Sequence, residues 1–187
     1  MLFRKGYTMN KKVLIISSSL RKDSNSEALA KEFEKGAAES GNEVEIVSLR
    51  DKHISFCRGC VACLKLGRCV INDDAVEIAE KMKNADVLVF ATPIYYYSVS
   101  GQLKTMLDRA NPLYDSDYRF TDIYLLAAAA EDEENTVEGA QKAVQGWVDC
   151  FPRAKLSGVI FAGGVNDAGD IAGHKSLKEA YKLGKNV

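Results

Sequence analysis

The chain alternates five times between an apolar segment that favours a β-strand and an amphipathic segment with helical spacing. The apolar segments cover residues 13–17, 43–49, 86–93, 122–130 and 156–163. Four are almost continuously apolar, as expected of parallel strands covered on both faces, whereas residues 43–49 alternate as an edge strand does. The alternation predicts one α/β domain over residues 1–187, a doubly wound five-stranded parallel sheet with helices on both faces. Ligands of such sheets bind at the carboxyl ends of the strands.

Composition excludes several classes of partner. The formal net charge is -1 and acidic and basic residues are interspersed, so we expect neither nucleic acid nor membrane as a partner. We find no run of about 18 apolar residues and no secretory signal in the opening decapeptide, and we expect a cytoplasmic protein. Residues 1–10 are interpreted as a disordered or loosely held N-terminal extension, and Met9 is an alternative start.

The segment after the first apolar run is rich in hydroxyl groups. Its polar side chains are Ser17, Ser18, Ser19, Arg21, Ser24, Asn25 and Ser26. Ser24 followed by Glu27 fits a capping box, which predicts a helix from Asn25 with free N–H groups facing this loop. Such a helix start favours an anion, although a polar turn that only caps the helix has the same composition. A G-x-G-x-x-G motif and a P-loop are both absent.

Three consecutive tyrosines follow the third apolar segment. Tyr95, Tyr96 and Tyr97 cannot all point into a core, so at least one ring is left to face a ligand. We expect Pro93 to end the strand and Ser98 or Ser100 to cap the next helix. A planar heteroaromatic ligand suits this loop, and an aromatic subunit interface is the alternative interpretation.

Together the motifs SSSLRKDSNSEAL and TPIYYYSVSGQLKTMLDR resemble the phosphate loop and the ring-binding loop of the flavodoxin-like NAD(P)H-dependent FMN reductase family. The resemblance implies the strand order 2-1-3-4-5, FMN between the first and third strands, and a homodimer or homotetramer. By position, it implies that the phosphate is held by Ser18, Ser19, Arg21, Ser24, Asn25 and Ser26. It implies that the isoalloxazine ring is framed by Pro93, Ile94, Tyr95, Tyr96, Tyr97 and Ser98.

Four of the five cysteines lie within thirteen residues, as Cys57, Cys60, Cys63 and Cys69. Their position after the second strand predicts that they share an edge of the sheet with the flavin. The C-x2-C-x2-C-x5-C spacing resembles that of iron-sulfur flavoproteins, a branch of the same family, which implies a [4Fe-4S] cluster on these four thiolates. Reduced thiols, a redox-active pair, zinc and disulfides remain alternatives. The fifth, Cys150, is expected to be a buried structural thiol.

The resemblance implies an FMN-dependent oxidoreductase that passes electrons from NAD(P)H through FMN to a second acceptor. That acceptor is a small molecule, such as a flavin or a quinone, or a redox protein. Because the flavin carries out the chemistry, no catalytic side chain is predicted. The alternative function is an electron carrier with a [4Fe-4S] cluster on residues 57–69, and the third is a flavin-binding or redox-sensing module.

Overall fold

The computed structural model describes residues 10–187, so residues 1–9 of the predicted N-terminal extension, with the alternative start at Met9, lie outside the described part. Five parallel strands form the sheet in the order β2-β1-β3-β5-β6. This is the predicted order, with the half-exposed strand at the edge. The bounds are β1 Lys12–Ser17, β2 Glu43–Ser48, β3 Val87–Tyr95, β5 Asp122–Ala128 and β6 Lys155–Ala162.

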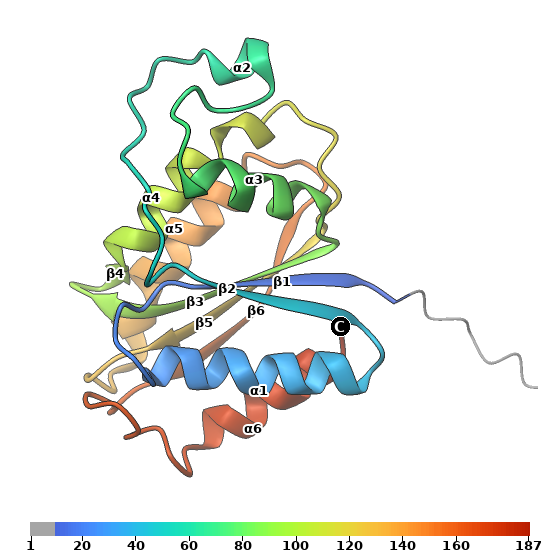
Figure 1. Cartoon of the computed structure of the whole chain (residues 1–187). Coiled ribbons are helices and arrows are strands. Elements are labelled where there is room, and N and C mark those ends of the chain that lie inside the picture. The colour runs from blue at the N-terminus through green and yellow to red at the C-terminus, as the bar shows by residue number, and fades with distance from the viewer. Residues whose placement is uncertain (1–9) are drawn as a thin grey trace, which may run out of the picture.

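Helices cover both faces of this sheet, as Figure 1 shows. One face carries α1 (Asn25–Glu39) and α6 (Lys175–Lys185), and the other carries α3 (Asp74–Asn84), α4 (Gly101–Arg109) and α5 (Glu138–Val148). A single-turn helix, α2 (Cys63–Leu66), and two 3-10 turns, Asn111–Leu113 and Glu134–Val137, complete the structure. None of the helices in the described part is long and apolar enough to cross a membrane.

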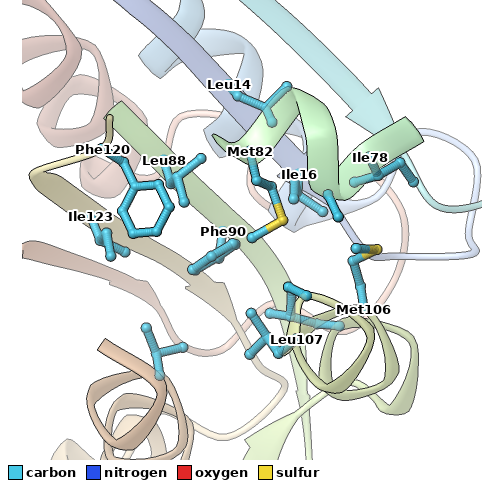
Figure 2. Packing of buried hydrophobic residues seen from close by; sticks show 14 of the residues in the cluster. Leu14, Ile16, Ile78, Met82, Leu88, Phe90, Met106, Leu107, Phe120 and Ile123 are labelled. Atoms are coloured by element: carbon cyan, nitrogen blue, oxygen red, sulfur yellow. The ribbon is translucent and has the colours of Figure 1, made fainter. Parts of the chain in front are cut away.

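Alternate residues of each central strand face opposite layers. In β1, Leu14 and Ile16 pack beneath α3 and α4, whereas Val13 and Ile15 pack beneath α1. Figure 2 shows the first of these layers, in which Leu14, Ile16 and the side chains of neighbouring strands meet Met82 of α3. A central strand therefore has apolar residues at almost every position, as the sequence predicted.

Two details of the third strand differ from the prediction. A sixth strand, β4 (Ser98–Val99), folds back antiparallel on β3, and β3 continues through Pro93 to Tyr95. The Ala91 carbonyl accepts from Ser18 N–H, and Pro93, two residues further on, faces the same side, where β1 has already ended at Ser17. Because no strand lies there to receive an N–H group, proline is tolerated inside β3.

Candidate functional site

The loop between β1 and α1 is anchored under the carboxyl edge of the sheet. Ser18, Ser19 and Ser26 are almost fully buried, at 0%, 2% and 1% exposure. Both the N–H and the hydroxyl of Ser18 donate to the Ala91 carbonyl of β3, at 2.9 and 3.1 Å. The loop is therefore held in place by the sheet itself.

Helix α1 begins at Asn25, as predicted, with Ser24 as its N-cap. The Ser24 hydroxyl accepts from Glu27 N–H at 3.3 Å. The first-turn N–H groups of Asn25 and Ser26 have no carbonyl partner within the helix, because a helix leaves its first donors unpaired. Only half of the capping box forms, since the Glu27 carboxylate pairs with Arg50 at 2.7 Å.

Arg50 is a site residue that sequence reasoning missed. It lies just after β2, and its guanidinium donates to the Arg21 carbonyl at 2.6 Å and to Glu27 at 2.7 Å. Burial raises the pKa of Glu27, but hydrogen bonds from Lys31 and Arg50 outweigh it and hold the pKa below its ordinary value. Arg50 thus fastens the loop to the end of β2, a pairing between distant residues that no local pattern reveals.

Two predicted phosphate ligands use their side chains to hold the turn after β6. Arg21 donates to the Asn166 carbonyl at 2.8 Å. Asn25 donates to the Asp167 carbonyl at 3.0 Å and accepts from Ile171 N–H at 3.3 Å. The turn after β6 therefore forms one wall of the site, and Asn25 acts there as a brace.

The aromatic segment is a tight β3–β4 hairpin. Tyr95 pairs with Ser98, which leaves Tyr96 and Tyr97 as the two turn residues, with φ of 49° and 61°. Positive φ at both positions is what a type I′ turn requires, and it is costly for residues other than Asn, Asp and Gly. The Tyr97 hydroxyl donates to Glu131 at 3.1 Å, and this hydrogen bond raises the pKa of Tyr97.

A cavity of about 160 Å³ lies between these segments. Of the predicted flavin-site residues, the cavity is lined by Ser19, Arg21, Ser24, Asn25, Ser26, Pro93, Ile94 and Tyr95. Ser18 lies beneath it, and Tyr96, Tyr97 and Ser98 lie outside its wall. Tyr96 is fully exposed, at 100%, so its ring is available at the rim.

A buried hydroxyl network joins the floor of the cavity to α4. Ser100, the N-cap of α4, donates from its hydroxyl to the Ser18 hydroxyl at 2.8 Å. Its N–H donates to the Thr92 hydroxyl at 3.0 Å, and its oxygen accepts from Leu103 N–H at 3.3 Å. The loops after β1 and β3 are therefore fixed relative to each other before any ligand binds.

The cysteine segment is built differently. Cys57 and Cys60 are exposed and Cys63, at the start of α2, is buried, while Cys69 is intermediate. The segment runs from the carboxyl end of β2 across the α3 layer to α2 at the far side (Figure 1). Within residues 10–187, no three His, Cys, Asp or Glu side chains are arranged to hold a metal ion.

All four cysteines nevertheless border one cavity of about 410 Å³. Its other walls include Asn111 and Trp147, near the C-terminal ends of α4 and α5. The cavity therefore lies away from the carboxyl edge, and the prediction that the thiols share that edge with the ligand is wrong. The thiols lie about the length of α4 away from the carboxyl edge, because the cysteine segment extends along the helix layer.

The prediction for Cys150 is also wrong. This residue is exposed and lines the same cavity as the other four cysteines. The buried stripe of α5 passes through Val144 and Val148 and continues to Phe151, at helical spacing. Cys150 lies off this stripe, so its neighbour Phe151 is buried while Cys150 is not.

A buried ion pair lies where the two limbs of the cysteine segment meet, the entering limb that follows β2 and the leaving limb that precedes α3. The guanidinium of Arg109, at the end of α4, binds both carboxylate oxygens of Asp73, at 2.7 and 2.8 Å. The side chains are 0% and 5% exposed. Sequence reasoning missed this pair, although Arg109 lies at helical spacing from the buried Met106 and is the one charged residue on that face of α4.

Comparison with known proteins gives one family. Residues 11–152 match the family model described as NADPH-dependent FMN reductase. An iron-sulfur flavoprotein of Methanocaldococcus jannaschii is 44% identical over 102 residues, which cover 54% of this chain and 53% of that protein. An iron-sulfur flavoprotein of Archaeoglobus fulgidus is 38% identical over 101 residues, covering 54% and 46%. The chain thus aligns with about half the length of these curated relatives.

Solved structures share the fold. An NAD(P)H:quinone oxidoreductase from Methanothermobacter marburgensis superposes with a TM-score of 0.74 at 19% identity, covering 95% of this chain and 96% of that one. An azoreductase from Bacillus anthracis gives a TM-score of 0.70 at 19% identity, covering 95% and 100%. At this level of identity the likeness establishes the flavodoxin-like architecture and nothing finer.

Proposed function

The chain belongs to the NADPH-dependent FMN reductase family, and from this premise we propose that it binds FMN at the carboxyl edge of the sheet and transfers electrons from NAD(P)H to a second acceptor. The acceptor class is a small oxidant such as a flavin or a quinone, or a redox protein. The observation that carries the proposal is the cavity lined by Ser24, Ser26 and Tyr95, which joins an anion site to an aromatic rim.

The residues present fit the phosphate of FMN. Unpaired N–H groups at the start of α1 face a loop of buried hydroxyls, and a helix N-terminus favours a negative charge. The hydroxyls of Ser19, Ser24 and Ser26 line the same cavity. The volume of about 160 Å³ accommodates the phosphate end, which leaves the ring system at the open rim beside Tyr95.

When bound, FMN supplies the redox chemistry, accepting two electrons from a nicotinamide and passing them on singly or in pairs. The chain itself binds and orients. The N–H groups of Asn25 and Ser26 compensate the phosphate charge, and the β3–β4 hairpin borders the ring. The Tyr97–Glu131 hydrogen bond fixes the position of that hairpin. No side chain is required to move a proton.

The test uses two variants at one position. Ser24→Asp keeps a good N-cap but introduces a negative charge where we place the phosphate, and Ser24→Asn is the neutral control. We expect Ser24→Asp to weaken FMN binding roughly hundredfold, because facing like charges cost several kcal/mol. Ser24→Asn is expected to retain most of the affinity, and riboflavin, which has no phosphate, to bind both alike. Equal FMN affinity in the two variants would contradict the site.

Turnover tests the reductase activity separately. The FMN-loaded protein is mixed with NADPH or NADH and a quinone or free FMN, and nicotinamide oxidation is followed at steady state. We expect sustained oxidation that depends on the acceptor. FMN binding without any turnover would retain the site and overturn the reductase proposal in favour of an electron carrier.

A [4Fe-4S] cluster on Cys57, Cys60, Cys63 and Cys69 is the second candidate, favoured by the cavity that all four thiols border. Four thiolates are the ligand set of such a cluster. Two sulfurs already accept N–H groups, Cys63 from Asn111 at 3.0 Å and Cys57 from Gly59 at 3.5 Å. The exposed positions of Cys57 and Cys60 leave these two thiols free to move inward.

Iron and acid-labile sulfide, measured on protein purified without oxygen, decide the matter. We expect about four of each per chain, a loss in Cys60→Ser, and no change in Cys150→Ser, whose thiol lines the cavity without belonging to the proposed ligand set. Flavin absorption with no iron would overturn the cluster and leave reduced thiols or a redox-active pair.

A further inference from the structure

We propose that Arg109 is a positioning residue that closes the neck of the cysteine segment, by which we mean the junction where Ser55 meets residues 71–73. Its guanidinium also places a fixed positive charge on the wall of the cavity that the four cysteines border. The inference rests on the proposed cluster for its electrostatic consequence, and on geometry alone for the closing of the neck. It makes Arg109 responsible for where the four thiols lie relative to the flavin site. It also makes this residue a determinant of the reduction potential of the cluster.

The guanidinium holds both limbs of the segment at once. Nη1 donates to the Ser55 carbonyl, on the entering limb, at 2.7 Å. Nη2 donates to the Ile71 carbonyl, on the leaving limb, at 3.0 Å. The same two nitrogens bind the Asp73 carboxylate in bidentate fashion. One buried side chain thus bonds to residues on either side of Cys57 and Cys69.

Asp73 completes the closure from the other side. Its carboxylate accepts from Ser55 N–H at 2.9 Å and, as the N-cap of α3, from Ala75 N–H at 3.2 Å. Burial raises the pKa of Asp73, but the hydrogen bonds from Arg109 and Ser55 outweigh it and lower the pKa. The neck is therefore a charged pair whose polar atoms are almost all satisfied within the protein.

One polar atom of the neck has no partner. Nε of Arg109 is buried and makes no hydrogen bond within residues 10–187. Arg109 and Cys69 line the same cavity, and the other cysteines of the segment border it too. A buried donor without a partner is costly, and sulfur ligands of a cluster are common acceptors of N–H groups.

The opposite end of α4 belongs to the flavin site. Ser100 caps the helix and bonds to Ser18 beneath the cavity, whereas Arg109 is its last residue. Nine residues at about 1.5 Å each separate the two ends by roughly 13 Å. A helix is stiff over this length, so Arg109 couples the position of the thiols to that of the flavin loops.

The electrostatic consequence has a definite sign. A cluster on four thiolates becomes more negative when it is reduced, and a fixed cation nearby stabilises the more negative state. The charge of Arg109 therefore raises the reduction potential. Lys52 and Lys104 are exposed cations paired with carboxylates, and water screens them, so neither has the same effect.

The experiment compares three variants of the full chain: Arg109→Gln removes the charge, Arg109→Lys keeps the charge but loses the fork, and Lys104→Gln removes an exposed charge from the same helix. Hydrogen exchange of residues 56–72 and the midpoint potential of the cluster are measured in each. We expect exchange to be about tenfold faster in both Arg109 variants and unchanged in Lys104→Gln. The potential should fall in Arg109→Gln and remain near that of the wild type in Arg109→Lys.

The outcomes separate the two proposals. Wild-type protein without iron would overturn the cluster, while exchange would still decide the neck. Wild-type exchange and potential in Arg109→Gln would overturn the inference. If Arg109→Gln does not fold, Arg109→Lys decides by exchange alone, because wild-type protection in that variant contradicts the role of the bidentate fork.

Discussion

Two loops leave the carboxyl edge of the same sheet and are stabilised in opposite ways. The loop after β1 is buried along its serines, and Ser18 bonds to both Ala91 and Ser100. The segment after β2 is exposed from Phe56 to Val61 and is fastened at its neck by Asp73 and Arg109. The conformation of the first loop is fixed by many buried contacts, whereas that of the second depends mainly on one ion pair at its ends, with the buried Cys63 as a further anchor.

The two loops differ in whether they are ordered before or after a ligand binds. A loop built into the sheet is preorganised, so a ligand that binds there spends little free energy on ordering it. A loop held at its ends and at one point between them, where Asn111 donates to Cys63, keeps more of its conformational entropy until a ligand binds to it, and metal binding is a common source of such order. We therefore describe the flavin site as formed by the fold and the cysteine site as completed by its ligand.

The largest predicted effect concerns the ion pair that holds the cysteine segment. Asp73→Ala leaves the Arg109 charge buried and unpaired, and the free energy of unfolding should fall by about 3–5 kcal/mol. The matched control is Asp74→Ala, which removes the neighbouring carboxylate from its pair with the half-exposed Lys52. Urea unfolding of both variants measures the difference. Equal losses would mean that the neck is no more important than a surface pair.

The same ion pair predicts a dependence of stability on pH. The pKa of Asp73 is lowered in the folded protein, so its contribution is fully present above the unfolded pKa of about 3.9 and is lost as pH falls through the folded pKa. We expect Asp73→Asn to flatten the acid limb of the stability curve measured by urea unfolding. An unchanged acid limb would exclude Asp73 as the group responsible.

In the loop after β1, which is held by many contacts, we expect a substitution at any single position to lower the stability less. Ser18→Ala removes the acceptor of the Ser100 hydroxyl and one donor to Ala91, which should cost about 1–2 kcal/mol of stability. FMN affinity should change less than in Ser24→Asp, because Ser18 lies beneath the cavity. Ser116→Ala, which removes a hydroxyl bonded to the Leu113 carbonyl elsewhere, is the control. A loss as large as that of Asp73→Ala would remove the contrast between the loops.

The smallest predicted effect is a gain. Tyr96 and Tyr97 have positive φ in the hairpin turn, and replacing them with Asn and Gly suits a type I′ turn. The double variant should be more stable by about 1 kcal/mol, after the lost hydrogen bond to Glu131. Thermal unfolding measures the gain. Greater stability with poorer flavin binding would show that the strained tyrosines serve the ligand.

Sequence patterns predicted the sheet because the order of apolar and polar residues in a strand depends on how many of its faces are buried. The alternation of Val44 and Ile46 with charged residues identified β2 as an edge strand, and uninterrupted apolar runs identified the central strands β1, β3 and β5. The same reasoning was wrong for β6, whose run is also apolar but which lies partly buried at the other edge. Ser24 predicted the start of α1 through local geometry. Strand β4 was missed because two residues carry no periodicity, and the strand end at Pro93 was misjudged because tolerance of proline depends on a neighbouring strand.

The site was predictable to the extent that its residues are contiguous. Two loops contributed eight predicted residues to one cavity, because both follow the carboxyl ends of adjacent strands. Arg50, Asp73 and Arg109 were missed because their partners are distant in the chain. For Arg109 a signal existed, namely a charge on the buried face of an amphipathic helix, which requires a buried partner.

Hydrogen exchange, followed on apo protein and after stepwise loading, tests the contrast between the two loops most directly. In apo protein we expect residues 17–26 to be strongly protected already and residues 56–70 to be only weakly protected, by the neck and by the turn of α2. Loading with FMN should add little protection to residues 56–70, whereas reconstitution with iron and sulfide should protect that segment. Equal protection of both loops in apo protein, or no response of residues 56–70 to reconstitution, would contradict the account.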